Sequence, residues 1–501
     1  MDPIFPNAAL GSQPSEPEAD GTRTERRHDL LALAVLALLT TILFADVLAG
    51  VNQFYMRDLT RYYYPTKQVL RDIVYGGEVP YWNRYFSAGQ PIAANPEHEV
   101  FYPLTWLILL PSYDLGFRLL ILSHIYIALF GMYCLLRSME LRPFSAFIGA
   151  LSFGLGGLFL SYINLLPILF CAAWIPLTCL YVRRFLLHKS LKDFALGSLF
   201  FGLQILVAEP TTILQTGALL GFYALYRAWY SQPRLAKAIS RVLWIATFCG
   251  CALLVGAAQI LPAIDHIHDS ARSRPFEFSL VSAWSLPWAK LAEAVFPNIL
   301  GHISIDRVMW YWGGGLYPGM GSPFLFSIYC GLLITAIAIG GAFARPRGGR
   351  LVLILVAFSL LIALGGHTPL FKFLYDYGIA TSIRYPEKFI LLGLFAVIVF
   401  GAQMLDRLVD GDQHVRDGAL GFVLATTVIS AVLAGLSFTH LYATGFSKIW
   451  GYTAGPVLNR MVGIMQTDWI VAVLRGGALA VLIFTATMKN RRLWTAAAAI
   501  F

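Results

Sequence analysis

The stretch RRHDLLALAVLALLTTILFADVLAG, residues 26–50, decides the fold. Its apolar run is long enough to cross the hydrocarbon core of a bilayer, which takes about 20 residues of helix. Basic side chains stand immediately before the run and favour the cytoplasmic side. We therefore expect residues 1–29 to form a disordered cytoplasmic tail. A cleaved signal peptide is the competing interpretation, but its apolar core would span only about 7–15 residues, so we favour an uncleaved anchor.

The composition excludes a water-soluble fold. The chain has 501 residues, of which 57% are hydrophobic and 13% charged, and its mean hydropathy is +0.65. The net charge of +9 is expected in cytoplasmic loops, where basic residues orient helices and meet anionic lipids, so no nucleic-acid partner is predicted. All six cysteines fall inside apolar runs, and we predict neither disulfides nor a cysteine metal site.

Eleven further apolar runs follow the first and predict an all-α polytopic membrane protein of about 12 transmembrane helices, spanning 30–487. They fall near 115–136, 145–162, 167–186, 191–208, 211–230, 241–262, 321–343, 351–366, 388–406, 417–437 and 468–487. Residues 488–501 then form a cytoplasmic tail or a truncated helix.

Basic residues gather in alternate connections, which supports a cytoplasmic amino terminus independently of the count of runs. The basic residues of these connections are Arg137 and Arg142; Arg183, Arg184 and Lys189; Arg227, Arg234, Lys237 and Arg241; Arg345, Arg347 and Arg350; Arg407 and Arg416; and Lys489, Arg491 and Arg492.

The extracytoplasmic connections are unequal in length. Those at 51–114 and 263–320 are long, and the one at 367–387 is intermediate. Connections of this length usually carry function, so we look for the functional residues there. The apolar segment 101–110 is too short to cross the membrane and predicts a short interfacial helix within the first loop.

An acidic residue near the start of the first loop is the leading catalytic candidate. Asp58 follows the first run closely and lies between Arg57 and Arg61. A carboxylate at the membrane surface can take a proton from an acceptor hydroxyl, while nearby cations set its pKa and hold an anionic substrate. The structural alternative is that Asp58 caps an interfacial helix whose tyrosines lie at the headgroups.

The rest of the loop is rich in rings, amides and acids. Aromatic and amide side chains of this kind suit sugar binding, and the candidates are Tyr62, Trp82, Asn83 and Asn95. Glu97 and Glu99 are candidates for a second catalytic acid or a metal ligand, and surface acids beside an aromatic belt are the alternative.

A possible divalent metal site lies at the outer end of the seventh run. On a helix Asp265 would lie beside His268 and Asp269. These residues are not part of an extended metal-binding motif, so a salt-bridged helix end is favoured. No cofactor is certain. The glycine-rich segment 310–323 lacks the strand and helix that a nucleotide loop requires, and we expect it to pack closely against another loop.

Two cations lie at the start of the apolar run near 388–406. Arg384 and Lys388 flank Glu387 there and are placed to bind a lipid phosphate and to stabilise charge on a leaving phosphate. Headgroup anchoring is the alternative. Ionisable residues inside the runs are scarce, and the main cases are Asp46, His124 and Glu209. A transporter usually carries more intramembrane charge.

The ordered segments of the chain resemble those of the bacterial YfhO-like membrane proteins, of the GT-C superfamily of glycosyltransferases. The segments are RDLTRYYYP (57–65), GGEVPYWNRYFSAGQPIAANPEHEVFYPLTW (76–106), QILPAIDHIHDSARS (259–273), YWGGGLYPG (311–319) and SIRYPEKF (382–389). Many YfhO-like chains are considerably longer and carry further helices or an outer domain at the carboxyl end.

The resemblance implies a GT-C-like bundle in the bacterial plasma membrane that transfers a sugar from a polyprenyl-phosphate donor outside the cytoplasm. The acceptor would be an envelope glycan, lipid or protein, and the reaction would generally invert the anomeric centre. Asp58 matches the family's catalytic acid, and Arg384, Lys388 and Arg61 would hold the phosphate. A flippase of lipid-linked glycans is the alternative function, and a non-catalytic assembly partner is a third.

Overall fold

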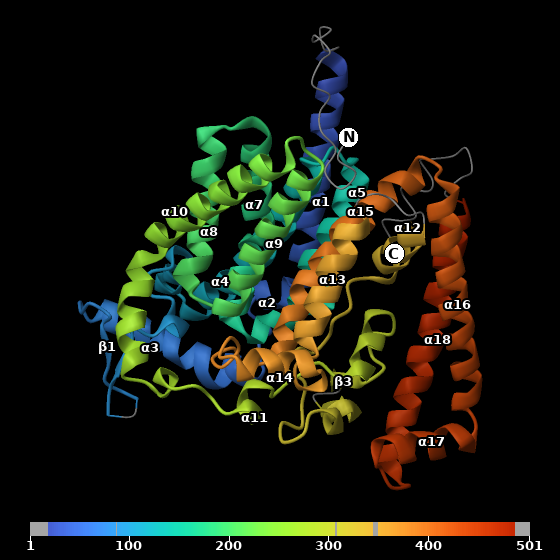
Figure 1. Ribbon diagram of the computed structural model, residues 1–501. Helices are drawn as coiled ribbons and strands as arrows, with labels where there is room; N and C mark the ends of the chain where they lie inside the picture. Colours follow the sequence, from blue (N-terminus) through green and yellow to red (C-terminus); the bar gives the residue numbers. More distant parts are fainter. Residues whose placement is uncertain (1–18, 87, 306–307, 344–348, 486–501) are drawn as a thin grey trace. The chain divides into compact units, whose positions relative to one another are not determined.

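Across the residues that the structure describes, the protein is mainly helical, with two short antiparallel sheets (Figure 1). The computed structural model describes residues 19–86, 88–305, 308–343 and 349–485. The chain divides into two compact units, one of residues 1–155 and 159–276 and the other of residues 156–158 and 277–501. The predicted transmembrane domain over 30–487 takes in most of both units, and the predicted tail at 488–501 lies outside the described residues.

The first unit is built from long helices joined by one extended loop. Its elements are α1 (Ala19–Leu43), α2 (Ala45–Leu48), η1 (Leu59–Tyr63), α3 (Tyr64–Tyr75), β1 (Trp82–Asn83), β2 (Gln90–Pro91), η2 (Pro96–His98), η3 (Pro103–Leu109), α4 (Tyr113–Arg137), α5 (Pro143–Gly154), α6 (Gly157–Ser161), η4 (Tyr162–Asn164), α7 (Leu166–His188), α8 (Leu191–Val207), α9 (Pro210–Trp229), α10 (Arg234–His268) and η5 (Ala271–Ser273).

The second unit combines shorter loop elements with a second set of helices. Its elements are α11 (Phe278–Val281), η6 (Trp288–Ala294), β3 (Gly301–Ile305), β4 (Val308–Tyr311), η7 (Trp312–Leu316), α12 (Leu332–Phe343), α13 (Gly349–Ala363), η8 (Gly365–His367), α14 (Pro369–Asp376), η9 (Pro386–Phe389), α15 (Ile390–Val409), α16 (Gln413–Ser437), α17 (His440–Trp450) and α18 (Pro456–Thr485).

Seven helical segments in the described part of the chain are long and apolar enough to cross a membrane. They are Tyr113–Arg137, Pro143–Asn164, Leu166–His188, Arg234–His268, Pro386–Val409, Gln413–Ser437 and Pro456–Thr485. The other five predicted runs form helices α1, α8, α9, α12 and α13, which are shorter or more polar. The described residues thus show an all-α protein with seven helices suited to a membrane, and the other five predicted spans stay a prediction.

Burial separates the central helices from those that face lipid. In the first unit the apolar window of α7 is 83% buried, whereas that of α10 is only 17% buried. Leu253, Leu254 and Leu261 are exposed on α10. A helix that stays apolar on its exposed face is suited to lipid and not to water, so α10 lines the edge of its unit and α7 its core.

Two predicted boundaries are wrong. Helix α1 begins at Ala19, so the predicted disordered tail overlaps it by about three turns. Helix α12 begins only at Leu332, because residues 321–331 of the predicted run near 321–343 are not helical. Three prolines or glycines in or beside this segment, Gly321, Pro323 and Gly331, interrupt the apolar pattern.

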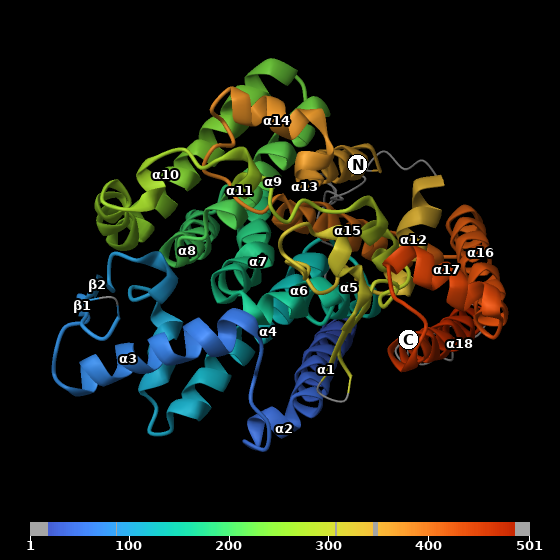
Figure 2. The ribbon, with the colours of Figure 1, turned by 90° about the horizontal axis from the view of Figure 1, so that it is seen from below.

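The first loop folds onto the membrane helices of its own unit. Helix α3 and the β1–β2 hairpin lie together at one end of the first unit (Figures 1 and 2). The predicted interfacial segment forms η3, which packs along α4. At Gly116 of α4 a side chain would lie 2.3 Å from the carbonyl oxygen of Leu107, so glycine is required for this contact. The loop is therefore fixed directly on a crossing helix.

Candidate functional site

Asp58 is exposed at the start of a continuous helical segment, as the sequence predicts for an acid near the membrane surface. It precedes η1, which runs into α3, and its side chain makes no capping hydrogen bond. Among the described residues, none forms an ion pair or hydrogen bond with its carboxylate. Arg57, one residue earlier, has a left-handed backbone with φ 43°. The capping alternative is therefore not realised, and the carboxylate is accessible.

A buried ion pair anchors the helix that carries Asp58. The Lys67 ammonium of α3 donates to a Glu99 carboxylate oxygen and to the carbonyl of His98, and both charged side chains are fully buried. Burial raises the pKa of Glu99 to about 7, although Lys67 opposes this shift. Glu99 also has a left-handed backbone, with φ 43°. Because the Glu99 carboxylate is fully enclosed, it is not accessible to a ligand in this conformation, and its catalytic role stays a prediction.

Tyr62 lies between the acids of the loop. Its ring stacks on His98 with centroids 6.1 Å apart and planes at 27°. Asn95 and Glu97 hydrogen-bond to its hydroxyl, and burial followed by the charges of Glu97 and Glu99 raises its pKa. Burial and then the nearby Lys67 lower the pKa of His98 to about 3, so the ring is neutral at physiological pH. A neutral, stacked pair of rings results beside Glu97.

Glu97 is half-buried and remains accessible beside this ring pair. Its backbone N–H donates to the Asn95 side chain at 3.1 Å, which caps η2. Its carboxylate lies 3.9 Å from the guanidinium of Arg272 in the same unit. Burial raises the pKa of the Tyr63 phenol, and the nearby charges of Glu97, Glu99 and Asp58 raise it further. The structure thus gathers the three predicted acids around Tyr62 and Tyr63.

The remaining loop candidates are two exposed side chains and one buried structural residue. Trp82 is exposed at the β1–β2 hairpin, and its indole covers Gly89, where any side chain would collide with it. Asn83 is buried and accepts the backbone N–H of Tyr85 at 3.0 Å, so it shapes the turn. Arg61 is exposed on η1. Trp82 and Arg61 are therefore available to a ligand, and Asn83 is not.

His124 is a packing residue, as the sequence interpretation favours. The Trp174 indole donates to the Tyr102 hydroxyl at 2.7 Å, and that hydroxyl lies 2.6 Å from His124 Nε2. The other ring nitrogen, Nδ1, lies 2.7 Å from the carbonyl of Leu120. Because Tyr102 receives one hydrogen bond and donates the other, His124 is held with its proton on Nδ1 and cannot relay one.

In the second unit, Arg384 and Lys388 both lie against the ring of Tyr385. The guanidinium carbon is 5.1 Å and the Lys388 ammonium 5.6 Å from its centroid. Tyr385 has a left-handed backbone with φ 66°, and its ring packs edge-on to Trp284 at 4.7 Å. The predicted pair of cations is thus brought together on one aromatic ring.

A second buried charge cluster supports this segment. The Lys290 ammonium lies 3.3 Å from Glu387 Oε1 and 3.5 Å from Glu293 Oε2, and it donates to the carbonyl of Leu325 at 2.5 Å. All three charged side chains are at most 1% exposed. Burial, opposed by Lys290, raises the pKa of Glu293 to about 7. The backbone N–H of Glu387 also donates to the carbonyl of Trp284 at 3.2 Å, which fixes the chain next to Lys388.

The glycine-rich segment packs closely on itself, and its predicted packing against another loop stays a prediction. A side chain at Gly314 would lie 2.5 Å from the carbonyl oxygen of Gly321. The metal candidates are not gathered into a site: Asp265 and His268 lie on the last turns of α10 with Asp269 as its cap. Within the ranges that the structure describes, no three histidine, cysteine, aspartate or glutamate side chains converge as metal ligands.

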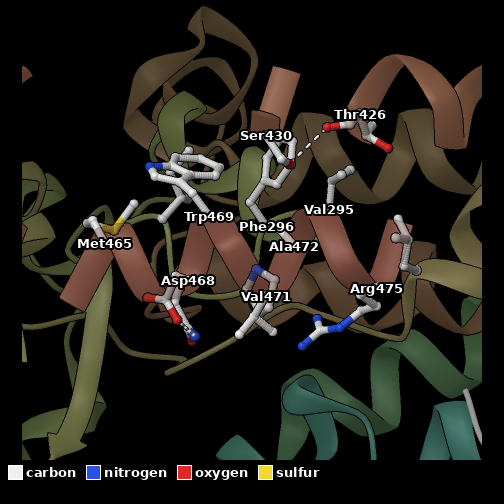
Figure 3. Close-up of a pocket in the computed structure, with 14 residues that line it drawn as sticks. Val295, Phe296, Thr426, Ser430, Met465, Asp468, Trp469, Val471, Ala472 and Arg475 are labelled. Carbon is white, nitrogen blue, oxygen red and sulfur yellow. Dashed lines mark hydrogen bonds between the residues drawn. The ribbon is translucent and has the colours of Figure 1, made fainter. Parts of the chain in front are cut away.

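A pocket that the sequence interpretation missed lies along α18 (Figure 3). Its polar lining consists of Asn298, Thr426, Ser430, Asp468 and Arg475. Asp468 accepts from Asn298 Nδ2 at 3.1 Å and is paired with His302 Nε2 at 2.7 Å. The sequence signal for this pocket is Arg475, a charged residue inside the apolar run near 468–487. The sequence interpretation did not include it among the ionisable residues of the runs.

Comparison with protein-family models and with curated proteins finds no match to this chain.

Proposed function

We propose that the protein is an integral-membrane glycosyltransferase that moves a sugar from a polyprenyl-phosphate donor to a cell-envelope acceptor on the extracytoplasmic side. The proposal includes a GT-C-like bundle of twelve spans in a bacterial plasma membrane, with a cytoplasmic amino terminus. The alternation of basic connections supports this orientation. The resemblance of five ordered segments to YfhO-like proteins supports the reaction.

The observation that carries the proposal is the accessible carboxylate of Asp58 on a helix anchored by the buried Lys67–Glu99 pair. A general base must be held in position, and a buried ion pair beneath its helix provides that support. Tyr62 and the exposed Trp82 offer ring faces for a sugar. Glu97 is the second accessible acid, and Glu99 is a positioning residue.

In the proposed reaction Asp58 takes the proton of the acceptor hydroxyl. The acceptor oxygen then forms a bond to the anomeric carbon, while the bond from that carbon to the polyprenyl phosphate breaks and the phosphate leaves with the electron pair. Cations near the leaving oxygen stabilise the charge that develops on it. The resemblance to YfhO-like proteins assigns this role to Arg384, Lys388 and Arg61, and the contact of Arg384 and Lys388 with Tyr385 supports the part of those two cations.

The test is sugar transfer by purified protein in nanodiscs with radiolabelled polyprenyl-phosphate sugars and an envelope extract. Asp58→Asn should lower the rate by about 100-fold or more, as expected for loss of a general base. Asp72→Asn is the matched control, because Asp72 is an exposed acid on α3 of the same segment. If Asp58→Asn, folded by gel filtration, transfers sugar as fast as the wild type, the catalytic assignment fails.

The alternative, a flippase of lipid-linked glycans, is supported by one observation, the charged side chain of Arg475 within the apolar helix α18. A flippase needs such polar groups along the path of the headgroup. Proteoliposomes with a labelled lipid-linked sugar in one leaflet distinguish the two functions. A flippase exposes the intact lipid to the other leaflet, whereas a transferase releases the polyprenyl phosphate.

A further inference from the structure

Arg475 lies deep within a membrane-crossing helix. Helix α18 runs from Pro456 to Thr485, and Arg475 stands ten residues before its described end, about 15 Å along the axis. An arginine at such a depth is costly unless it is paired or faces a polar cavity, and it therefore marks a functional site by default.

No protein group neutralises this charge in the described part of the chain. Arg475 is half-buried, and none of the described residues forms an ion pair or hydrogen bond with it. The nearest acid along the pocket, Asp468, lies two helical turns away, about 10 Å, and is already bonded to Asn298 and His302. The uncompensated charge of the pocket is therefore positive.

Helices α16 and α18 pack closely and contribute hydroxyl groups to the pocket that Arg475 also lines. At Gly476 a side chain would lie 2.1 Å from the Thr427 hydroxyl, so the helices touch at this glycine. The hydroxyls of Thr426 and Ser430 line the same pocket. Each donates at 2.9 Å to a carbonyl of its own helix, an arrangement that leaves it free to turn and donate to a bound anion.

The size and rim of the pocket select the anion. The cavity measures about 40 Å³, space for a few waters or one phosphate group and too little for a sugar ring. Its lining also includes Phe296, Met465 and Trp469 (Figure 3). Leu474, beside Arg475, is 67% exposed on the helix surface. Apolar side chains in the lining and an exposed leucine next to Arg475 suit a phosphate that carries hydrocarbon chains.

We propose that the pocket formed by residues 295–299 and helices α16 and α18 binds a phosphate group, with the Arg475 guanidinium as its main ligand. The phosphate is carried by a lipid of the surrounding leaflet. Arginine holds phosphate through paired N–H donors, and a lysine at the same place would provide only a point charge. The proposed phosphate site does not depend on sugar transfer, so its test is independent of the test of the proposed function.

The test measures binding of ³²P-labelled phosphatidate to the purified full-length protein in detergent. We compare Arg475→Gln with Arg460→Gln, which removes an exposed arginine from the outer part of the same helix. We expect Arg475→Gln to weaken binding at least tenfold and Arg460→Gln to leave it within twofold. Equal binding by Arg475→Gln and wild type overturns the proposal.

Two further arms keep the test decisive. Inorganic phosphate is added as competitor: displacement at millimolar concentration supports a free phosphate as the occupant, and failure to displace supports a lipid phosphate. If Arg475→Gln does not fold, Ala472→Cys replaces it, because Ala472 lines the pocket beside Arg475. Phosphatidate should slow maleimide labelling of that cysteine at least fivefold, as read by peptide mass spectrometry, and unchanged labelling overturns the proposal.

Discussion

Lys67 and Glu99 form a fully buried ion pair in which the ammonium also donates to the backbone carbonyl of His98. This pair joins helix α3 to the turn that carries Glu97, so the accessible acid and the helix of Asp58 share one support. The Tyr62 ring, stacked on His98, lies between these two elements.

We expect Lys67→Met to destabilise the protein by about 3–5 kcal/mol, because it leaves the buried Glu99 charge without a partner. The double variant Lys67→Met with Glu99→Gln should lose less unfolding free energy than the two single variants lose together. Thermal unfolding in detergent measures both. Arg84→Gln breaks the exposed Arg84–Glu78 pair of the same loop and should cost less than about 1 kcal/mol. Additive costs for Lys67 and Glu99 would contradict the coupling.

Glu293 makes stability depend on pH in a defined direction. Its pKa is raised from 4.5 to about 7 in the folded protein, so the folded state binds the proton more tightly than the unfolded state. Stability is therefore lost as pH rises from about 4.5 to about 7. Glu293→Gln should match wild type at pH 4.5 and exceed it at pH 8 by an amount on the order of 3 kcal/mol.

Unfolding temperatures measured across this pH range check the prediction. Glu277→Gln serves as control, because Glu277 is an exposed acid of the same unit and should leave the pH profile unchanged. A Glu293→Gln profile parallel to that of wild type would show that folding does not raise the pKa of Glu293.

Gly476→Ala should destabilise the second unit by about 1–3 kcal/mol, because its methyl group would meet the Thr427 hydroxyl at 2.1 Å. Adding Thr427→Ala should restore most of the loss. Gly477→Ala is the matched control on the same helix, since nothing lies within 4 Å of a side chain there. Equal unfolding temperatures for the two alanine variants would exclude the tight contact.

Arg384→Gln should raise the KM for the polyprenyl-phosphate donor by about 10–100-fold, the effect of losing one charge-assisted hydrogen bond. The KM for the acceptor should stay unchanged, because the proposed contact is with the donor phosphate. Lys372→Gln removes an exposed cation of the same unit, one paired with Asp376 at 2.8 Å, and should alter neither constant. A rise in the acceptor KM alone would reassign Arg384 to the acceptor.

The sequence predicted the helices that are uniformly apolar. The runs near 115–136 and 388–406 correspond to α4, Tyr113–Arg137, and α15, Ile390–Val409. It failed at 321–331, where length and hydropathy suggested a span but glycine and proline end the helical pattern. A sum of hydropathy values does not register where the backbone can continue as a helix.

The candidate site was predicted in its residues but not in its pairings. The exposure of Asp58 and the meeting of Arg384 with Lys388 followed from position near a span. The partner of Glu99 did not, because Lys67 is 32 residues away and only the folded loop brings them together. Lys290 was missed for the same reason, since Glu387 is its partner across a long stretch of chain.

Gly116, where η3 lies directly on α4, has a consequence for the acceptor. The contact between η3 and α4 leaves no space for even a methyl group, so this part of the loop is held in a fixed position on the helix. In the proposed transferase, Asp58 and Glu97 would then serve a hydroxyl that comes down to the lipid surface. A long, finished glycan would have to bend down to that level, whereas a lipid-anchored acceptor already lies within it.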